Sequence, residues 1–161
     1  MPKPLSKEFL INRGYCCNFG CLYCPYKEKS VLVTNIDGES VKWQIKGKEV
    51  RSDNRPRSSL HLGAREILKK RFPTQQILEE VPVPIKRGKT LFLDFYLPLR
   101  KIAIEVHGEQ HYKRSTLYHS SAQDFLNQKS NDRMKEEWCE LNGITHIVLP
   151  FDEIDNWGEM I

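Results

Sequence analysis

Two neighbouring apolar segments, residues 91–97 (LFLDFYL) and 102–106 (IAIEV), each carry a single carboxylate. The first segment alternates and ends at Pro98, and the second is nearly all apolar and stops at Gly108, so the pattern predicts two strands joined by a turn. A charged residue inside an apolar strand is costly to bury unless it is paired or holds a metal. Asp94 and Glu105 therefore predict a site where their oxygens meet. The alternative is an edge hairpin in which both carboxylates point to solvent.

The carboxylate pair predicts a metal-dependent hydrolytic site. Oxygen ligands from Asp94 and Glu105 suit Mg²⁺ or Mn²⁺. Such an ion can polarise a phosphate and lower the pKa of a bound water. His107 follows directly and is a candidate general base, or a group that holds the attacking water or the phosphate. Gln110 and His111 are candidates to orient that water or to contact the substrate.

The same hairpin resembles the core of PD-(D/E)XK nucleases, in which an Asp on one strand is followed by Glu-x-Lys on the next. The match here is Asp94 followed by Glu105, with His107 where that superfamily usually has Lys. The run IAIEVHGEQHY is also similar to the IE-x-x-G-x-QH stretch of phage and mobile-element nucleases. These are related to very-short-patch repair endonucleases and to homing endonucleases with an EDxHD core. The resemblance covers roughly residues 58–156. It implies a restriction-endonuclease-like fold and cleavage of nucleic acid, with DNA favoured over RNA.

A first helix precedes the hairpin. Ser58 or Ser59 opens it, and it runs to about residue 72, where a proline follows. The resemblance to nucleases places Glu66 of this helix at the metal site, directly or through water. The alternative is that Glu66 pairs with Lys69 or Lys70 on the helix surface.

A second, long helix is predicted over residues 122–142, with Gly143 as its stop. Similar nucleases carry a basic residue on this helix that faces the site. Lys135, or Lys129, is therefore expected to supply the positive charge of the missing lysine, and Lys135 is also a candidate contact to nucleic acid. A helical salt bridge between Asp132 and Lys135 explains these two residues equally well.

The predicted fold class is α/β, with a central mixed sheet and helices packed against it. Two further strands are expected at residues 75–83, where Pro82 and Pro84 fit a strand end or an edge, and at 144–149. Residues 58–161 would form this nuclease-like domain, and residues 47–57 a basic linker. Residues 1–46 would form a cysteine-rich knuckle and a short hairpin, because 161 residues suit one domain with a small appendage.

Four of the five cysteines predict a metal-binding knuckle: Cys16, Cys17, Cys21 and Cys24. Such clustering argues for a metal in a reducing compartment, and against a disulfide framework. Thiolates select Zn²⁺ or an iron–sulfur cluster, whereas four buried thiols packed as small hydrophobes are the alternative. CNFGCLYC matches the CxxxCxxC of radical S-adenosylmethionine enzymes. The longer string RGYCCNFGCLYCPY is similar to short cysteine-rich bacterial proteins, and it favours a structural Zn²⁺ over an iron–sulfur cluster.

Basic residues outside the hairpin predict contacts with a nucleic-acid backbone, because guanidinium groups pair well with phosphate oxygens. They lie in the linker and in the turn before residue 89: Arg51, Arg55, Arg57, Lys86 and Arg87. A solvated linker is the alternative. The net charge of +4 allows such binding without requiring it. No apolar run is long enough to span a membrane, and the N-terminus has no signal core, so a cytoplasmic protein without a membrane partner is expected.

Three functions are compatible with these patterns. The first is a Mg²⁺-dependent DNA endonuclease or nickase of phage, homing or repair type. The second is a catalytically inactive, zinc-containing nucleic-acid-binding module, because the Glu-x-Lys lysine is absent. The third is an iron–sulfur enzyme. A nuclease that cuts both strands would most simply act as a homodimer, or within a larger phage or host complex.

Overall fold

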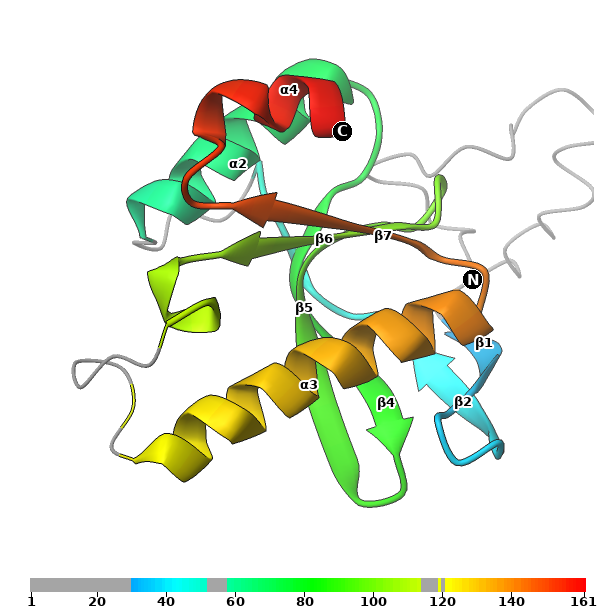
Figure 1. The fold of residues 1–161 in the computed structure, drawn as a ribbon. Helices are drawn as coiled ribbons and strands as arrows, with labels where there is room; N and C mark the ends of the chain where they lie inside the picture. The colour runs from blue at the N-terminus through cyan, green and yellow to red at the C-terminus, as the bar shows by residue number, and fades with distance from the viewer. Residues whose placement is uncertain (1–29, 52–57, 114–118, 120) are drawn as a thin grey trace, which may run out of the picture.

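The computed structural model describes residues 30–51, 58–113, 119 and 121–161. Its centre is a five-stranded sheet in the order β3 (Lys48–Glu49), β4 (Leu78–Lys86), β5 (Lys89–Leu97), β6 (Ile102–His107) and β7 (Thr145–Pro150). Strands β6 and β7 are parallel, and the other neighbouring strands are antiparallel. Helices cover the sheet (Figure 1). The predicted α/β class with a mixed sheet flanked by helices is confirmed.

The helices bury the two faces of the sheet in separate apolar clusters. Helix α3 (Ala122–Leu141) packs on one face through Trp138. Helix α2 (Ser59–Arg71) and the short helix α4 (Trp157–Met160) pack on the other, where Leu68 is fully buried. Successive side chains of a strand point to opposite faces. Accordingly, Phe95 and Leu97 of β5 join the cluster of α2, while Tyr96 between them joins that of α3.

A hairpin of β1 (Ser30–Thr34) and β2 (Ser40–Gln44) packs beside β4. Its Trp43 is buried, and the indole N–H donates to the carbonyl of Pro82 at 2.8 Å. The strand predicted at residues 75–83 lies three residues later, so Pro82 and Pro84 fall inside β4. They are tolerated there because β3 pairs only with Leu78 and Glu79, which leaves the rest of that side of β4 without ladder bonds to β3.

Local capping signals fix the two long helices close to their predicted bounds. The side chain of Ser58 accepts a hydrogen bond from the backbone N–H of His61 at 3.3 Å, which caps the start of α2. Gly143, with φ of +66°, follows the last turn of α3. In the part of the chain that the structure describes, no helix is long and apolar enough to cross a membrane.

The predicted linker at residues 47–57 begins inside the sheet. Strand β3 falls within it, and Val50 is buried in the cluster that α2 covers. The predicted cysteine knuckle and two of the predicted phosphate contacts lie outside the described residues: Cys16, Cys17, Cys21, Cys24, Arg55 and Arg57.

Candidate functional site

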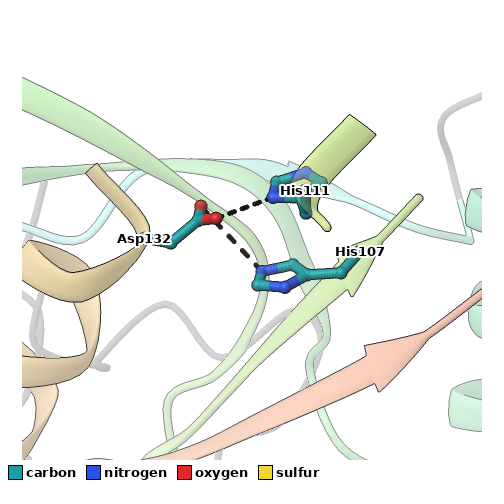
Figure 2. Close-up of side chains that lie close together, drawn as sticks. All are labelled: His107, His111 and Asp132. Carbon is teal, nitrogen blue, oxygen red and sulfur yellow. Dashed lines mark hydrogen bonds and ion pairs between the residues drawn. The ribbon is translucent and has the colours of Figure 1, made fainter. Parts of the chain in front are cut away.

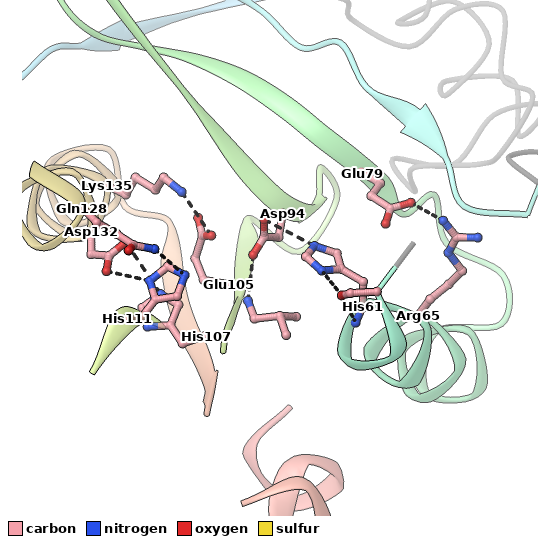
Figure 3. A network of polar contacts seen from close by, with 12 residues as sticks. His61, Arg65, Glu79, Asp94, Glu105, His107, His111, Gln128, Asp132 and Lys135 are labelled. Atoms are coloured by element: carbon pink, nitrogen blue, oxygen red, sulfur yellow. Dashed lines mark hydrogen bonds and ion pairs between the residues drawn. The ribbon is translucent and has the colours of Figure 1, made fainter. Parts of the chain in front are cut away.

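Asp94 and Glu105 lie where β5 and β6 separate. The ladder between these strands pairs Phe95 with Ile104 and continues toward the turn, so the two carboxylates sit just beyond its last pair. One oxygen of Asp94, Oδ2, accepts the backbone N–H of Val106 at 2.8 Å. This bond lets a side chain satisfy a donor of β6 at the point where the ladder stops. Figure 3 shows both carboxylates at this junction, between α2 and α3.

His61 of α2 sets the charge of Asp94. Its Nε2 lies 3.5 Å from Asp94 Oδ1, and both side chains are 26% exposed. Burial raises the pKa of Asp94, but the hydrogen bond and charge of His61, the charge of Lys135 and the Val106 amide together outweigh burial. They lower the pKa from 3.8 to about 2. Asp94 is therefore an anion at every physiological pH.

Glu105 is in the opposite electrostatic state. Its side chain is 2% exposed, and the ammonium of Lys135 on α3 contacts Oε2 at 3.3 Å. Burial first, and the Asp94 carboxylate second, raise the pKa of Glu105 well above its ordinary value, although Lys135 opposes both. Its other oxygen, Oε1, is buried and accepts no hydrogen bond among the described residues, while the Asp94 carboxylate lies within hydrogen-bond reach of the protonated Glu105 carboxyl.

These two carboxylates fit a divalent cation. A buried carboxylate oxygen without a partner is costly unless a ligand satisfies it, and a second carboxylate beside it adds like charge. A small cation that prefers oxygen ligands would coordinate the buried oxygen and offset the negative charge of the two carboxylates. The donor set of Asp94 and Glu105 suits Mg²⁺ or Mn²⁺.

Three further side chains form a second cluster (Figure 2), beside Glu105 (Figure 3). His107 ends β6, His111 lies on the short 3-10 helix η1 (Glu109–His111), and Asp132 comes from α3. The two imidazole rings stack with centroids 4.0 Å apart and planes within 6°. His111 Nδ1 lies 2.8 Å from Asp132 Oδ2, and His107 Nε2 lies 4.0 Å from Asp132 Oδ1.

The hydrogen bonds around His111 form a chain in which each group donates to the next, from His119 through Gln128 and His111 to Asp132. Because the Asp132 carboxylate accepts, Nδ1 of His111 carries the proton and Nε2 is left as an acceptor. The amide nitrogen of Gln128 lies 3.1 Å from that Nε2 and donates to it. The amide oxygen of Gln128 in turn accepts from Nε2 of His119. Asp132 thus holds His111 in the tautomer that a general base needs.

His107 is held in its neutral form. Burial, and then the neighbouring His111, lower the pKa of His107 from 6.5 to about 4, although Asp132 and Asp94 act in the opposite direction. The ring of His107 is therefore neutral near pH 7. A base with so low a pKa is a weak proton acceptor at that pH.

The sequence is similar to uncharacterized proteins of three viruses. No family model matches the sequence, and no solved structure matches it. It is 35% identical over 72 residues to uncharacterized protein 307L of Invertebrate iridescent virus 6, and 30% identical over 64 residues to uncharacterized protein 033L of Invertebrate iridescent virus 3. These matches cover 42% and 40% of this chain but only 36% and 33% of those proteins, so the chain spans about a third of their length.

A third relative is matched over most of its length. Uncharacterized protein 094L of Frog virus 3 (isolate Goorha) is 32% identical over 108 residues, which cover 66% of this chain and 68% of that protein. The chain belongs to the 094L family. None of the three names states an activity, so the function of this 094L-family chain has to be argued from its own geometry.

The structure of this 094L-family member places Glu66 away from the site, contrary to the expectation from the nuclease resemblance. Its side chain is 62% exposed and pairs with Lys69 at 3.0 Å, one helical turn further along α2. His61 is the residue of α2 that reaches the carboxylates instead. Gln110 lies on η1 next to His111 and lines a polar cavity of about 400 Å³ together with Gln128.

The predicted nucleic-acid contacts fall in different places. Arg51 makes structural contacts, because its guanidinium donates to the carbonyl oxygens of Phe72 and Gln75 and pairs with Glu49. Its predicted role in binding phosphate is therefore corrected to one of joining the end of α2 to the sheet. The side chains of Lys86 and Arg87 are exposed at the turn between β4 and β5.

Three residues of the site were not assigned to it from the sequence: His61, Gln128 and Asp132. Gln128, Asp132 and Lys135 follow one another at helical spacing of four and three residues, so one face of α3 presents all three to the site. That spacing is a signal the sequence contains. His61 lies on α2 at the spacing of its buried residues.

Proposed function

We propose that this protein is a metal-dependent nuclease that hydrolyses phosphodiester bonds, acting on DNA as an endonuclease or nickase. The observation that carries the proposal is the convergence of Asp94 and Glu105 at the end of β5 and β6. Glu105 presents a buried oxygen without a protein partner among the described residues. A carboxylate pair of this kind beside a His–Asp pair is a suitable arrangement for metal-assisted attack of water on a phosphate.

Asp94 and Glu105 would hold one Mg²⁺ or Mn²⁺, which would polarise the scissile phosphate and lower the pKa of a bound water. Lys135 keeps its ammonium 3.3 Å from Glu105 and is 15% exposed. In this position it compensates the charge of the carboxylates, and it can donate to a phosphate oxygen of the substrate. It supplies the positive charge that Glu-x-Lys nucleases place on the strand itself.

His111 is the proposed general base, in place of His107. Asp132 holds the Nδ1 proton, so Nε2 accepts, and the attacking water would replace the Gln128 amide at that nitrogen. His107 stacks on His111 and fixes the plane of its ring. The role of His107 is therefore to position the base.

Cleavage of supercoiled plasmid tests the metal site. We expect nicking or linearisation in Mg²⁺ or Mn²⁺ and none in a chelator. Asp94→Asn keeps the shape of the side chain but removes a charged ligand. It should slow cleavage by about 100-fold or more, because metal coordination supplies several kcal/mol of transition-state stabilisation. Cleavage by Asp94→Asn at the wild-type rate would show that the site is assigned wrongly.

The His111–Asp132 pair needs a separate test. Asp132→Asn leaves a hydrogen-bonding group of the same size but no longer favours the tautomer with the proton on Nδ1. We expect the cleavage rate to fall by about 10²-fold or more, with unchanged binding of a DNA duplex. An unchanged rate in Asp132→Asn would remove His111 from the mechanism, while leaving the metal site in place.

A further inference from the structure

The cluster of His107, His111 and Asp132 has the composition of a transition-metal site, separate from the carboxylate pair. One ligand atom from each residue lies within 4.8 Å of the other two. Figure 2 shows the Asp132 carboxylate directed at both rings, with a dashed line to each. None of the three residues is a ligand of the Asp94–Glu105 site, so the two sites share no donor atom.

The donor types select the ion. Two imidazole nitrogens and one carboxylate oxygen favour Zn²⁺, Co²⁺ or Ni²⁺, whereas Mg²⁺ prefers oxygen ligands alone. Neighbouring ligand atoms around a tetrahedral zinc ion lie about 3.3 Å apart. The separations of 2.8 Å between His111 and Asp132 and 4.0 Å between His107 and Asp132 lie on either side of that value. Each imidazole binds a metal in the plane of its own ring, so the two stacked rings would have to tilt out of parallel to complete the site, with a fourth position open to water.

Gln128 is suited to support such an ion. A histidine that binds a metal through one ring nitrogen usually donates its other N–H to an oxygen. If the ion binds Nδ1 of His111 in place of the proton there, and the proton moves to Nε2, the ring stays neutral. Rotation of the Gln128 amide by half a turn would then present its oxygen, now directed at His119, to that N–H.

We propose that His107, His111 and Asp132 bind a zinc-class ion, and that its binding stops phosphodiester hydrolysis. The inhibition rests on the proposed nuclease function, because the ion would occupy both members of the His–Asp pair that takes the proton from water. The binding itself does not depend on that function. Zn²⁺ would then bind at a site distinct from that of Mg²⁺ and inhibit the Mg²⁺-dependent reaction.

Zinc stoichiometry of the full chain tests the binding. The four clustered cysteines are expected to bind Zn²⁺ in every variant, so the measurement is a difference between chains that share them. Wild type and Asp94→Asn should each bind one equivalent more than His107→Leu and Asp132→Asn, by calorimetry and metal analysis. Affinity at this site should fall about 100-fold or more when a ligand is lost. Equal stoichiometry in all four chains, or an equivalent lost only in Asp94→Asn, overturns the proposal.

Cobalt provides a second readout that does not depend on activity. Co²⁺ in this site should give visible d–d absorption that Asp132→Asn lacks, while thiolate charge-transfer bands from the cysteines stay equal in both chains. Gln128→Leu should weaken the site by about 10-fold to 100-fold. Cobalt spectra that are identical in wild type and Asp132→Asn would refute the ligand set.

Inhibition is then measured for each variant relative to its own rate in Mg²⁺ without zinc at the second site. Wild type should lose its cleavage as the extra equivalent binds, and His107→Gln should retain a larger fraction of whatever rate it has. Equal inhibition of both chains would place the inhibitory zinc elsewhere. If wild type cleaves nothing even without zinc, the nuclease proposal fails, and the zinc stoichiometry still decides whether the site exists.

Discussion

Replacing Glu105 with Gln should stabilise the metal-free protein at neutral pH. The folded state raises the pKa of Glu105 well above 4.5 through burial and the nearby Asp94 carboxylate, even with Lys135 beside it. Between the ordinary pKa and the raised one, the unfolded chain releases a proton that the folded chain keeps. Wild-type stability therefore falls as pH rises through this range, and it stays lower above it. Glu105→Gln has no such proton to lose.

The size of the gain follows from linkage. Every unit by which the folded pKa exceeds the ordinary value costs the wild type about 1.4 kcal/mol above that pKa. For a chain of this length, 1 kcal/mol corresponds to about 2–4 °C in Tm. We therefore expect Glu105→Gln to have a higher Tm than the wild type in a chelator at pH 7, and the difference to vanish toward pH 4.

Asp94→Asn is the matched comparison, with the opposite sign. In the wild type, folding lowers the pKa of Asp94 from 3.8 to about 2. The charge of Asp94 therefore stabilises the folded state above pH 3.8, and this contribution is lost as pH falls toward 2. That shift corresponds to about 2 kcal/mol, and Asp94→Asn should lower Tm by about 4–8 °C at pH 7.

Thermal unfolding monitored by circular dichroism, from about pH 2 to about pH 8 with and without Mg²⁺, measures both effects. Mg²⁺ at about 100 times its dissociation constant should stabilise the wild type by about 2.7 kcal/mol and stabilise neither variant to that extent. A Glu105→Gln protein that is less stable than wild type in chelator at pH 7 would refute the electrostatic reasoning.

Three further predictions concern the scaffold, each checked by urea unfolding. Glu79→Leu removes the buried carboxylate that pairs with Arg65 and should cost about 1–3 kcal/mol; an unchanged midpoint would show that the pair does not stabilise the fold. Gly47→Ala places a Cβ 2.9 Å from a side-chain carbon of β4, and should cost about 1–3 kcal/mol. Asn142→Ala removes two bonds between the end of α3 and Thr34 of β1, and should cost about 2 kcal/mol; an unchanged midpoint would show that the hairpin does not depend on them.

The sequence predicts the local elements well because their signals are local. The cap at Ser58, the left-handed glycine at Gly143 and the apolar segments around Asp94 and Glu105 each depend on a few consecutive residues. The sequence pattern places the strand that contains Pro82 three residues too early. Prolines are tolerated inside this strand because β3 pairs with only its first two residues, so the strand's bounds depend on how far β3 extends along β4. That extent is a tertiary property that no local pattern encodes.

The choice between Glu66 and His61 shows what helix geometry adds to sequence reading. Ala64 and Leu68 are the fully buried residues of α2, and Glu66 is two positions, or about 200° of rotation, from each of them. His61 is only about 20° from Leu68, counted around the helix, so it lies on the buried side. The resemblance to nucleases favoured an acidic residue on this helix, whereas the rotation of the helix places a histidine at the site.

The His–Asp pair could not be placed from the sequence, for a different reason. His111 and Asp132 are 21 residues apart, and their contact depends on how α3 crosses the ends of the strands. The sequence contains both residues, but a salt bridge between Asp132 and Lys135 on the same helix explains Asp132 equally well. In the structure, Lys135 pairs with Glu105 instead, which leaves Asp132 to His111.

The most direct test of the central claim compares two glutamates in one assay. Glu105→Gln and Glu66→Gln are the same chemical change, at a buried carboxylate in the site and at an exposed one on α2. The rate of Mg²⁺-dependent plasmid nicking should fall by about 100-fold or more in Glu105→Gln and stay at the wild-type value in Glu66→Gln. Loss of nicking in Glu66→Gln, with nicking retained in Glu105→Gln, would contradict the site described above.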